Sequence, residues 1–240
     1  LETFDTWTIL AILTGSCFLP TFYLMSITVK RISITVSTIA SKISLIIPVS
    51  ASLFYLNQNN SYTTLTILGL FIGLIAILLS SVRNKVPLDP TLVRTKLDYF
   101  LPVLVFMGGG LVDVLINITN YTYLPADKSS LFPFFAFSAA ACIGIIVLAY
   151  TLFVKQEKIT MKNCIAGIVL GIPNYLSIYF LLKTLKDYNN NGAIVFPLLN
   201  ILVILFSALV ATIFFREKLN TYNYIGLLLA ILSLGILISF

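Results

Sequence analysis

The sequence predicts an all-α polytopic membrane protein, and three observations support this fold class. Hydrophobic residues make up 59% of the 240 residues and charged residues only 10%, whereas an ordinary soluble domain carries about 25% charged residues. The apolar residues form continuous runs of the length, about 20 residues, that spans a bilayer as a helix. Segments of ~10 residues with alternating polarity, which would indicate a β-barrel, do not occur in the sequence.

Eight apolar runs are predicted to be membrane-spanning helices. The longest polar connection, at 83–98, contains two prolines and four basic residues and is the natural linker between two halves. Most Lys and Arg residues of the short loops fall on one side of these helices, which the positive-inside rule assigns to the cytoplasm. The predicted helices cover residues 6–28, 33–56, 64–82, 99–122, 130–153, 162–183, 192–215 and 221–239.

Two parts of the chain resemble each other in sequence. Residues 50–79 align with 207–236 without gaps, so that Gly69 pairs with Gly226. Residues 15–30 align more loosely with 171–186. The first three predicted helices therefore match the last three, which indicates two five-helix repeats, the first lacking its two initial helices in this chain. An odd number of helices per repeat gives the two repeats opposite orientations, as in many secondary transporters.

Three stretches resemble the EamA-type permeases of the drug/metabolite transporter superfamily. They read "LPVLVFMGGGLVDVLINITNYTYL", "GIPNYLSIYFLLKTL" and "VFPLLNILVILFSALVATIFFREKLNTYNYIGLLLAILSLGILI". The resemblance implies a first EamA repeat at 1–82, a linker at 83–98 and a second repeat at 99–240, from an expected total of ten helices. It also implies a bacterial cytoplasmic membrane protein with both termini in the cytoplasm, which is opposite to the orientation from the basic residues. The turn that carries Glu217 has no acidic counterpart in the first repeat.

The composition argues against several other functions. The chain has no histidine and only three cysteines, Cys17, Cys142 and Cys164, which are scattered through it, so neither a metal site nor a disulfide framework is predicted. No phosphate-binding motif of the form GxxxxGK[ST] is present. Asp113 is the one aspartate inside a predicted helix, whereas an intramembrane aspartyl protease needs two. We therefore expect no enzyme, no cofactor and no nucleic-acid partner, with the net charge of +6 residing in loops.

Asp113 is the first candidate for a functional residue. It lies near the middle of the predicted helix at 99–122, where a charge facing lipid would cost ~3 kcal/mol or more. On a helix Gly109, Asp113 and Asn117 share one face, which must then point to a polar interior. That face could bind substrate or a coupling ion, or its polar side chains could join neighbouring helices by structural hydrogen bonds. The adjacent glycines would let a neighbouring helix approach closely; they are Gly108, Gly109 and Gly110.

Lys42 is the second candidate, about ten residues into the predicted helix at 33–56. That depth is ~15 Å, half the thickness of the hydrocarbon core, so the ammonium would reach the membrane surface only with strain. An ion pair with Asp113 is one alternative for Lys42, which would then serve either in substrate binding or coupling or as a structural partner. Ser44 lies near Lys42 on the same helix, and Pro48 is predicted either to contribute to helix packing or to kink the helix.

Two further groups are predicted to line the interior. Pro197 and Asn200 share a face of the helix at 192–215, and Asn200 aligns with Ser44 in the repeat. The helix at 162–183 contains Pro173, whose expected kink would expose backbone groups to a cavity or to a neighbouring helix. Both a cavity wall and a packing kink remain open for this second group, which comprises Gly171, Pro173, Asn174, Tyr175, Ser177 and Tyr179.

The sequence as a whole predicts a secondary transporter that moves a small metabolite or drug-like solute by alternating access. Proton coupling is one alternative for its energy source, and facilitated exchange is another. A channel or a non-transporting scaffold protein is the alternative function. The expected partners are the lipid bilayer and a small-molecule substrate, and the sequence leaves the substrate, the direction of transport and the oligomeric state open.

Overall fold

The computed structural model describes residues 5–56, 63–81, 96–154, 156, 160–214, 216 and 219–238. Over these residues the regular structure is helical throughout, without a strand, which confirms the predicted all-α class. Most of the predicted linker at 83–98 lies outside the described residues, as does Glu217. The positions of the predicted repeats in the sequence stay a prediction.

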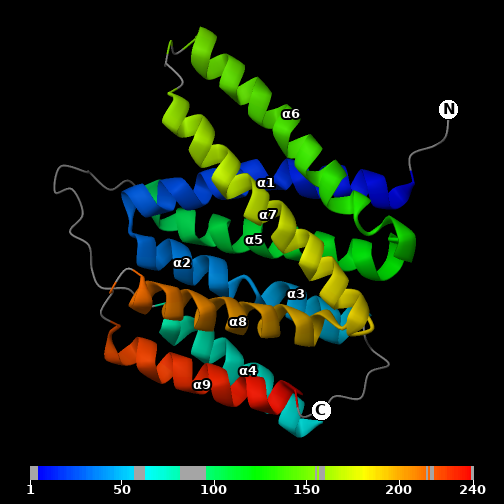
Figure 1. Ribbon diagram of the computed structural model, residues 1–240, viewed down its shortest axis with the longest axis vertical. Helices are drawn as coiled ribbons and strands as arrows, with labels where there is room; N and C mark the ends of the chain where they lie inside the picture. Colours follow the sequence, from blue (N-terminus) through cyan, green and yellow to red (C-terminus); the bar gives the residue numbers. More distant parts are fainter. Residues whose placement is uncertain are drawn as a thin grey trace. The chain divides into compact units, whose positions relative to one another are not determined.

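The helices follow the predicted apolar runs closely (Figure 1). Short 3₁₀ segments, η2 at Lys96–Phe100 and η4 at Ala126–Lys128, flank α5 and α6, and π-helical turns, η1 at Ser52–Leu56 and η3 at Thr119–Tyr123, extend α3 and α5. The α-helices are α1 Thr6–Arg31, α2 Ile34–Ile43, α3 Ile46–Ala51, α4 Thr64–Ser80, α5 Leu101–Ile118, α6 Leu131–Phe153, α7 Met161–Asp187, α8 Gly192–Ile213 and α9 Thr221–Ile238.

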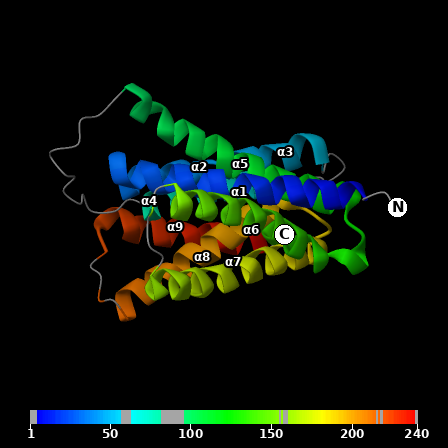
Figure 2. The same cartoon turned by 90° about the horizontal axis from the view of Figure 1, so that it is seen from above.

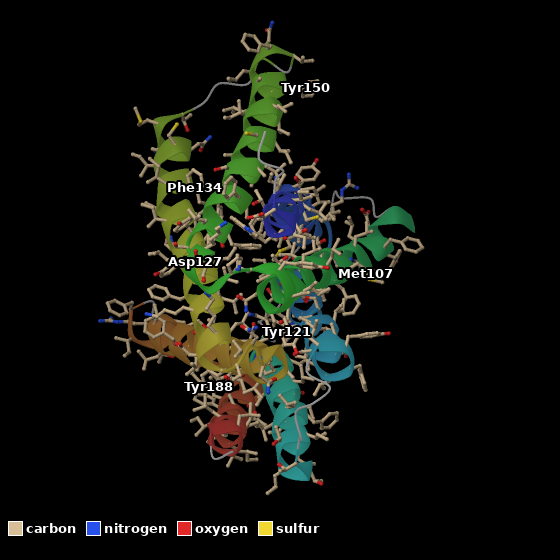
Figure 3. The ribbon with its side chains drawn as sticks, turned by 90° about the vertical axis from the view of Figure 1, so that its right-hand side faces the viewer. Met107, Tyr121, Asp127, Phe134, Tyr150 and Tyr188 are labelled. Carbon is tan, nitrogen blue, oxygen red and sulfur yellow. The ribbon has the colours of Figure 1, made fainter. Side chains whose placement is uncertain are left out.

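Six helical segments of the described chain are long and apolar enough to cross a membrane. The sequence predicted eight membrane-spanning helices, whereas the two further apolar helices of the described chain, α4 and α9, are shorter than the six that are long enough to cross a membrane. Large apolar side chains stand out from the helices, and Met107, Phe134 and Tyr150 are each more than half exposed (Figure 3). An exposed apolar surface of this kind suits lipid, and the architecture is that of a multi-pass membrane protein.

The predicted helix at 33–56 is interrupted in the structure. It consists of α2, α3 and the π turn η1, and Ser44 and Leu45 lie between α2 and α3. The two helices follow one another along one path (Figure 2). Pro48 explains the interruption, because proline has no N–H and its ring crowds the carbonyl four residues earlier, that of Ser44. The Ser44 carbonyl accepts instead from the Ile47 N–H at 3.0 Å. The span is therefore tightened locally to 3₁₀-type bonds.

The chain divides into two compact units, each made of two segments. The first unit comprises Leu1–Pro20 and Leu115–Asn190, and the second comprises Thr21–Val114 and Asn191–Phe240. In the first unit Gly15 lies against the backbone of Ala136, so α1 and α6 touch without an intervening side chain. The rings of Trp7 and Phe135 meet edge to face at 5.6 Å beside this contact. Helix α6 is therefore fixed to the start of α1.

In the second unit α4 and α9 pack side by side and antiparallel (Figure 1). Gly69 at the start of α4 lies against Ile236 and Leu237 at the end of α9. Gly226 at the start of α9 lies against Ser80 at the end of α4. Close helix contacts at small residues are the usual way in which helices associate in lipid, where the hydrophobic effect is absent.

Candidate functional site

Three consecutive glycines bring α5 into close contact with its neighbours in the second unit. A Cβ atom at Gly108 would lie 2.9 Å from Thr21 Oγ1 of α1, and one at Gly109 would lie 2.9 Å from Ser44 Oγ. A Cβ at Gly110 would lie 2.9 Å from the Cβ of Ile47 in α3. Each glycine therefore faces a different neighbouring segment. Through these contacts the interruption at Ser44 and Leu45 lies against α5. The contact point, Gly109, is one helical turn before Asp113.

Lys42 reaches from α2 to α8. Its Nζ donates a hydrogen bond of 2.8 Å to Asn200 Oδ1, and Asn200 Nδ2 donates to the Phe196 carbonyl at 3.0 Å. The second bond fixes the orientation of the amide, so that its oxygen faces the lysine. A neutral amide thus serves as the partner of a charged amine, at the last turn of α2, where the helix dipole also favours a cation.

Asp113 lies on α5 in the same unit and is partly buried. The expected ion pair with Lys42 is not formed, because no Lys42 nitrogen lies within 4.0 Å of an Asp113 oxygen. The two charges nevertheless interact electrostatically. Among the described residues, no hydrogen bond or ion pair reaches Asp113. Lys42 thus donates to Asn200, and the Asp113 carboxylate has no direct partner among the described residues.

Ser44 and Pro197 are both buried in this unit. The Ser44 hydroxyl donates to the Ser41 carbonyl at 2.7 Å and lies beside Gly109, so it belongs to the contact between the interrupted span and α5. Pro197 lies inside α8, three residues before Asn200. The sequence alignment of Ser44 with Asn200 pairs two residues that contact the same short region, the last turn of α2.

The candidate residues on α7 belong to the first unit. The helix runs without interruption through Pro173, and Gly171 is exposed with no heavy atom of a described residue within 4 Å of a Cβ placed there. Tyr175 packs its ring against Phe137 of α6 at 5.7 Å, whereas the ring of Tyr179 meets that of its own neighbour, Phe180, edge to face. Ser177 Oγ donates to the Asn174 carbonyl at 2.7 Å, which is a bond within the helix.

A cluster of buried amides lies in the first unit, at the end of α5. Asn117 is 0% exposed, and neither atom of its amide has a hydrogen-bond partner among the described residues. Asn120, in the π turn η3, donates to Asn190 Oδ1 at 2.7 Å, while its own Oδ1 is buried and unpaired. A buried polar group without a partner costs about 1–3 kcal/mol. Asn117 therefore needs a polar partner, such as water or a bound solute.

Two contacts were not predicted from the sequence. Asn190 adopts a left-handed backbone conformation, with φ of 58°, at the end of α7 and receives the bond from Asn120. Arg31 Nη1 lies 3.3 Å from Asp98 Oδ1 and links the end of α1 to the start of the span that contains α5. The opposite charges of Arg31 and Asp98, both at predicted helix ends, were a usable signal for that pair. Nothing in the sequence marked Asn190.

The comparisons with known proteins show similarity without a described activity. No family model matches the chain. An uncharacterized protein of Haemophilus influenzae is 27% identical over 214 residues, which span 88% of this chain and 68% of that protein. A solved crystal structure is similar with a TM-score of 0.56 at 13% identity, over 94% of this chain and 73% of that one. The structural similarity concerns the fold alone.

Proposed function

We propose that this protein is a secondary transporter of the EamA type, which moves a small polar solute across the membrane by alternating access. The observation that carries the proposal is the arrangement of Lys42, Asn200 and Asp113. Both ionisable residues lie in apolar spans of one compact unit, Lys42 within the interrupted helix and Asp113 on α5, which contacts it. Ionisable residues inside membranes are costly and mark substrate or ion pathways, and discontinuous helices commonly line such sites.

The contacts between α4 and α9 support inverted repeats. Gly69 meets Leu237, and Gly226 meets Ser80. The sequence alignment pairs Gly69 with Gly226, and at the same spacing it pairs Ser80 with Leu237. The contact of Gly69 with Leu237 and the contact of Gly226 with Ser80 therefore join equivalent positions of the two aligned segments. Contacts about a two-fold axis have this pattern. Because the helices are antiparallel, this axis runs across them, as the axis between inverted repeats does.

The remaining parts of the proposal follow from this arrangement. The lipid bilayer covers the exposed apolar side chains, and the bacterial cytoplasmic membrane is the proposed location. The solute binds at Lys42 and Asp113, and movement between the two repeats exposes it to one side of the membrane at a time. Neither nucleotide hydrolysis nor a cofactor is part of this mechanism. A proton gradient is the proposed energy source, since Asp113 is a carboxylate without a direct partner among the described residues.

Uptake into proteoliposomes tests the proposal. The full-length protein would be reconstituted and given labelled amino acids, amines and sugars, with and without an imposed pH gradient. We expect saturable uptake of one class, which the pH gradient accelerates. Uptake that rises linearly with concentration would indicate a channel, and no uptake of any class would contradict transport of these solutes.

Two variants make the test specific to the site. Asp113→Asn removes the charge with little change in shape, and we expect it to abolish the acceleration by the pH gradient. Lys183→Gln is the matched control, because Lys183 is an exposed residue of α7 outside the proposed site. Size-exclusion chromatography and circular dichroism would show that both variants are folded. Equal acceleration by the gradient in Asp113→Asn would rule out Asp113 as the coupling residue.

A further inference from the structure

The first half of α7 is exposed on all sides. Every residue from 161 to 173 is exposed, and α7 is the least buried of the six long apolar helices that the structure describes. Two glycines lie in this half, Gly167 and Gly171, and a Cβ placed at either would have no described heavy atom within 4 Å. Their spacing of four puts both on one face of the helix. Helices in membranes approach each other closely at such pairs of small residues, and the described chain makes no such contact here.

The face with the two glycines continues a stripe of α7 that is buried in its second half. Ile178, Leu182 and Leu185 are all buried, and they follow Gly171 at spacings of seven, four and three residues. These spacings place them on the same face of the helix as Gly171. A side of α7 that faces lipid would be exposed in both halves. The stripe is instead packed in one half and uncovered in the other, which indicates an interface that the described chain fills only in part.

The counterpart of this face in the first repeat is packed. Residues 15–30 align with 171–186, so Gly15 of α1 corresponds to Gly171, and at the same spacing Ala11 corresponds to Gly167. Ala11 is 0% exposed, and a Cβ at Gly15 would lie 2.9 Å from the Cα of Ala136 in α6. These residues of α1 and α6 belong to the first unit, as α7 does. Helix α6 thus packs on the small-residue face of α1, whereas the equivalent face of α7 is uncovered.

We propose that the exposed face of α7 at Gly167, Ile168 and Gly171 is the docking surface for a further membrane-spanning helix, the equivalent of α6 in the first repeat. Helix α6 directly precedes α7, so its equivalent directly precedes α1. Where a two-fold axis relates two repeats, the contact of α6 with α1 implies the equivalent contact of that helix with α7. This inference rests on the inverted repeats of the proposed function, and it does not depend on transport.

The docking surface defines the helix that fits it. The side chains around the glycines are apolar, so the occupant is an apolar helix of about 20 residues. Its contact residue opposite Gly171 is small, as Ala136 of α6 is opposite Gly15. The Haemophilus influenzae relative and the solved structure both extend beyond the part that this chain matches, so similar proteins contain further chain that can supply such a helix.

Photo-crosslinking identifies what covers the docking surface. A benzophenone amino acid would replace Ile168 in the protein expressed from its whole coding sequence in bacterial membranes, and mass spectrometry would identify the linked peptides. Ile168 is 63% exposed and neighbours Gly171 on the helix surface, whereas Val169 is 62% exposed and points to the other side, which makes it the control position. We expect the probe at Ile168 to link to a peptide of the helix before α1, and the probe at Val169 to form no such link.

A second variant tests the close approach of the two helices. Gly171→Leu keeps the surface apolar, so lipid accepts it, but the leucine side chain would hold a docked helix away. We expect a weaker crosslink from Ile168 and an unfolding temperature lower by at least about 2–4 °C, as overpacking of a helix contact causes. Gly235→Leu is the matched control, because a Cβ at Gly235 of α9 also has no described heavy atom within 4 Å. It should leave the crosslink from Ile168 unchanged.

The other outcomes overturn the inference. A link from Ile168 to residues of this chain, with a crosslinked dimer on a denaturing gel, would assign the surface to a second copy. The absence of any linked peptide at Ile168 would show that the surface faces lipid, as would an unchanged unfolding temperature in Gly171→Leu. Uptake into proteoliposomes decides transport separately. A protein that forms the expected link but transports no solute would remove the proposed function and leave the docking surface standing.

Discussion

The Lys42 Nζ and the Asn200 Oδ1 lie 2.8 Å apart, although 158 residues separate them in the sequence. This hydrogen bond joins α2 to α8 within one compact unit. It places a charged amine on a neutral amide, while a carboxylate of opposite charge, that of Asp113, lies in the same unit beyond ion-pair distance. The two opposite charges of this unit therefore do not pair with each other.

Removing the amide should destabilise the protein. Asn200→Ala leaves the Lys42 ammonium without its hydrogen-bond partner, and we expect a loss of about 1–3 kcal/mol in the free energy of unfolding. Reversible unfolding in detergent would measure it. In Lys42→Met the amine is absent, so Asn200→Ala in that background should cost distinctly less. Equal costs in the two backgrounds would show that the hydrogen bond contributes nothing to stability.

Gly110 should not tolerate a side chain. A Cβ there would lie 2.9 Å from both Cβ and Cγ1 of Ile47, so Gly110→Ala forces α5 away from α3. We expect a loss of about 1–3 kcal/mol, as for other overpacked positions. Gly171→Ala in this 240-residue chain is the control, because a Cβ there has no described atom within 4 Å and alanine is the better helix former by about 1 kcal/mol. Thermal unfolding of the two variants should therefore shift in opposite directions.

Two glycines of α9 should differ in the same way. A Cβ at Gly226 would lie 2.6 Å from the backbone nitrogen of Ser80, whereas one at Gly235 would meet no described atom within 4 Å. Gly226→Ala should therefore separate α9 from α4 and lower the unfolding temperature, whereas Gly235→Ala should leave it unchanged or raise it. Thermal unfolding of the two variants measures this difference, and equal shifts would show that α9 does not pack against α4 in this register.

The environment of Trp7 should respond to acid. Asp5, just before α1, accepts hydrogen bonds from Trp7 Nε1 at 3.0 Å and from Lys128 Nζ at 3.2 Å, and these two partners lower the pKa of its carboxyl, Trp7 most of all. A lowered pKa means that the contribution of Asp5 to stability is present above the ordinary aspartate value and is lost as the pH falls through the lowered one.

Fluorescence can follow this titration, because Trp7 is the single tryptophan of the chain. We expect the Trp7 emission to change at a pH below about 3.9, the ordinary midpoint of an aspartate. Asp5→Asn should abolish the change, and Asp127→Asn, which alters a nearby acidic residue of η4, should preserve it. An acid transition that persists in Asp5→Asn would assign it to another group.

The sequence predicted the helices well because length and apolarity alone decide which segments can span a bilayer. It placed α1 and α6 within a few residues of their ends. It did not predict the interruption at Ser44 and Leu45 as a separation of two helices, because a proline causes either a kink or a break according to its neighbours. The surroundings of Pro48 include the contact of Ile47 with Gly110 of α5, and that contact depends on tertiary packing.

The candidate site was predicted in part. Asp113 and Lys42 were recognisable because ionisable residues are conspicuous in apolar runs. The partner of Lys42 was not recognisable, since charge alone pointed to Asp113, whereas Lys42 donates its hydrogen bond to a neutral amide 158 residues away in the sequence. The amide of Asn190 was equally hidden, because its role depends on a left-handed backbone conformation that Asn189 and Asn190 both adopt and that the sequence does not mark.

The pairing of α4 with α9 also has a consequence for biosynthesis. Roughly 140 residues lie between the two helices, so α4 is made and inserted long before its partner exists. At ~5–20 residues per second, the ribosome needs on the order of ten seconds to reach α9. During that interval the face of α4 that carries Gly69 lacks α9, and the contact between the two helices forms only after the intervening residues have been synthesised.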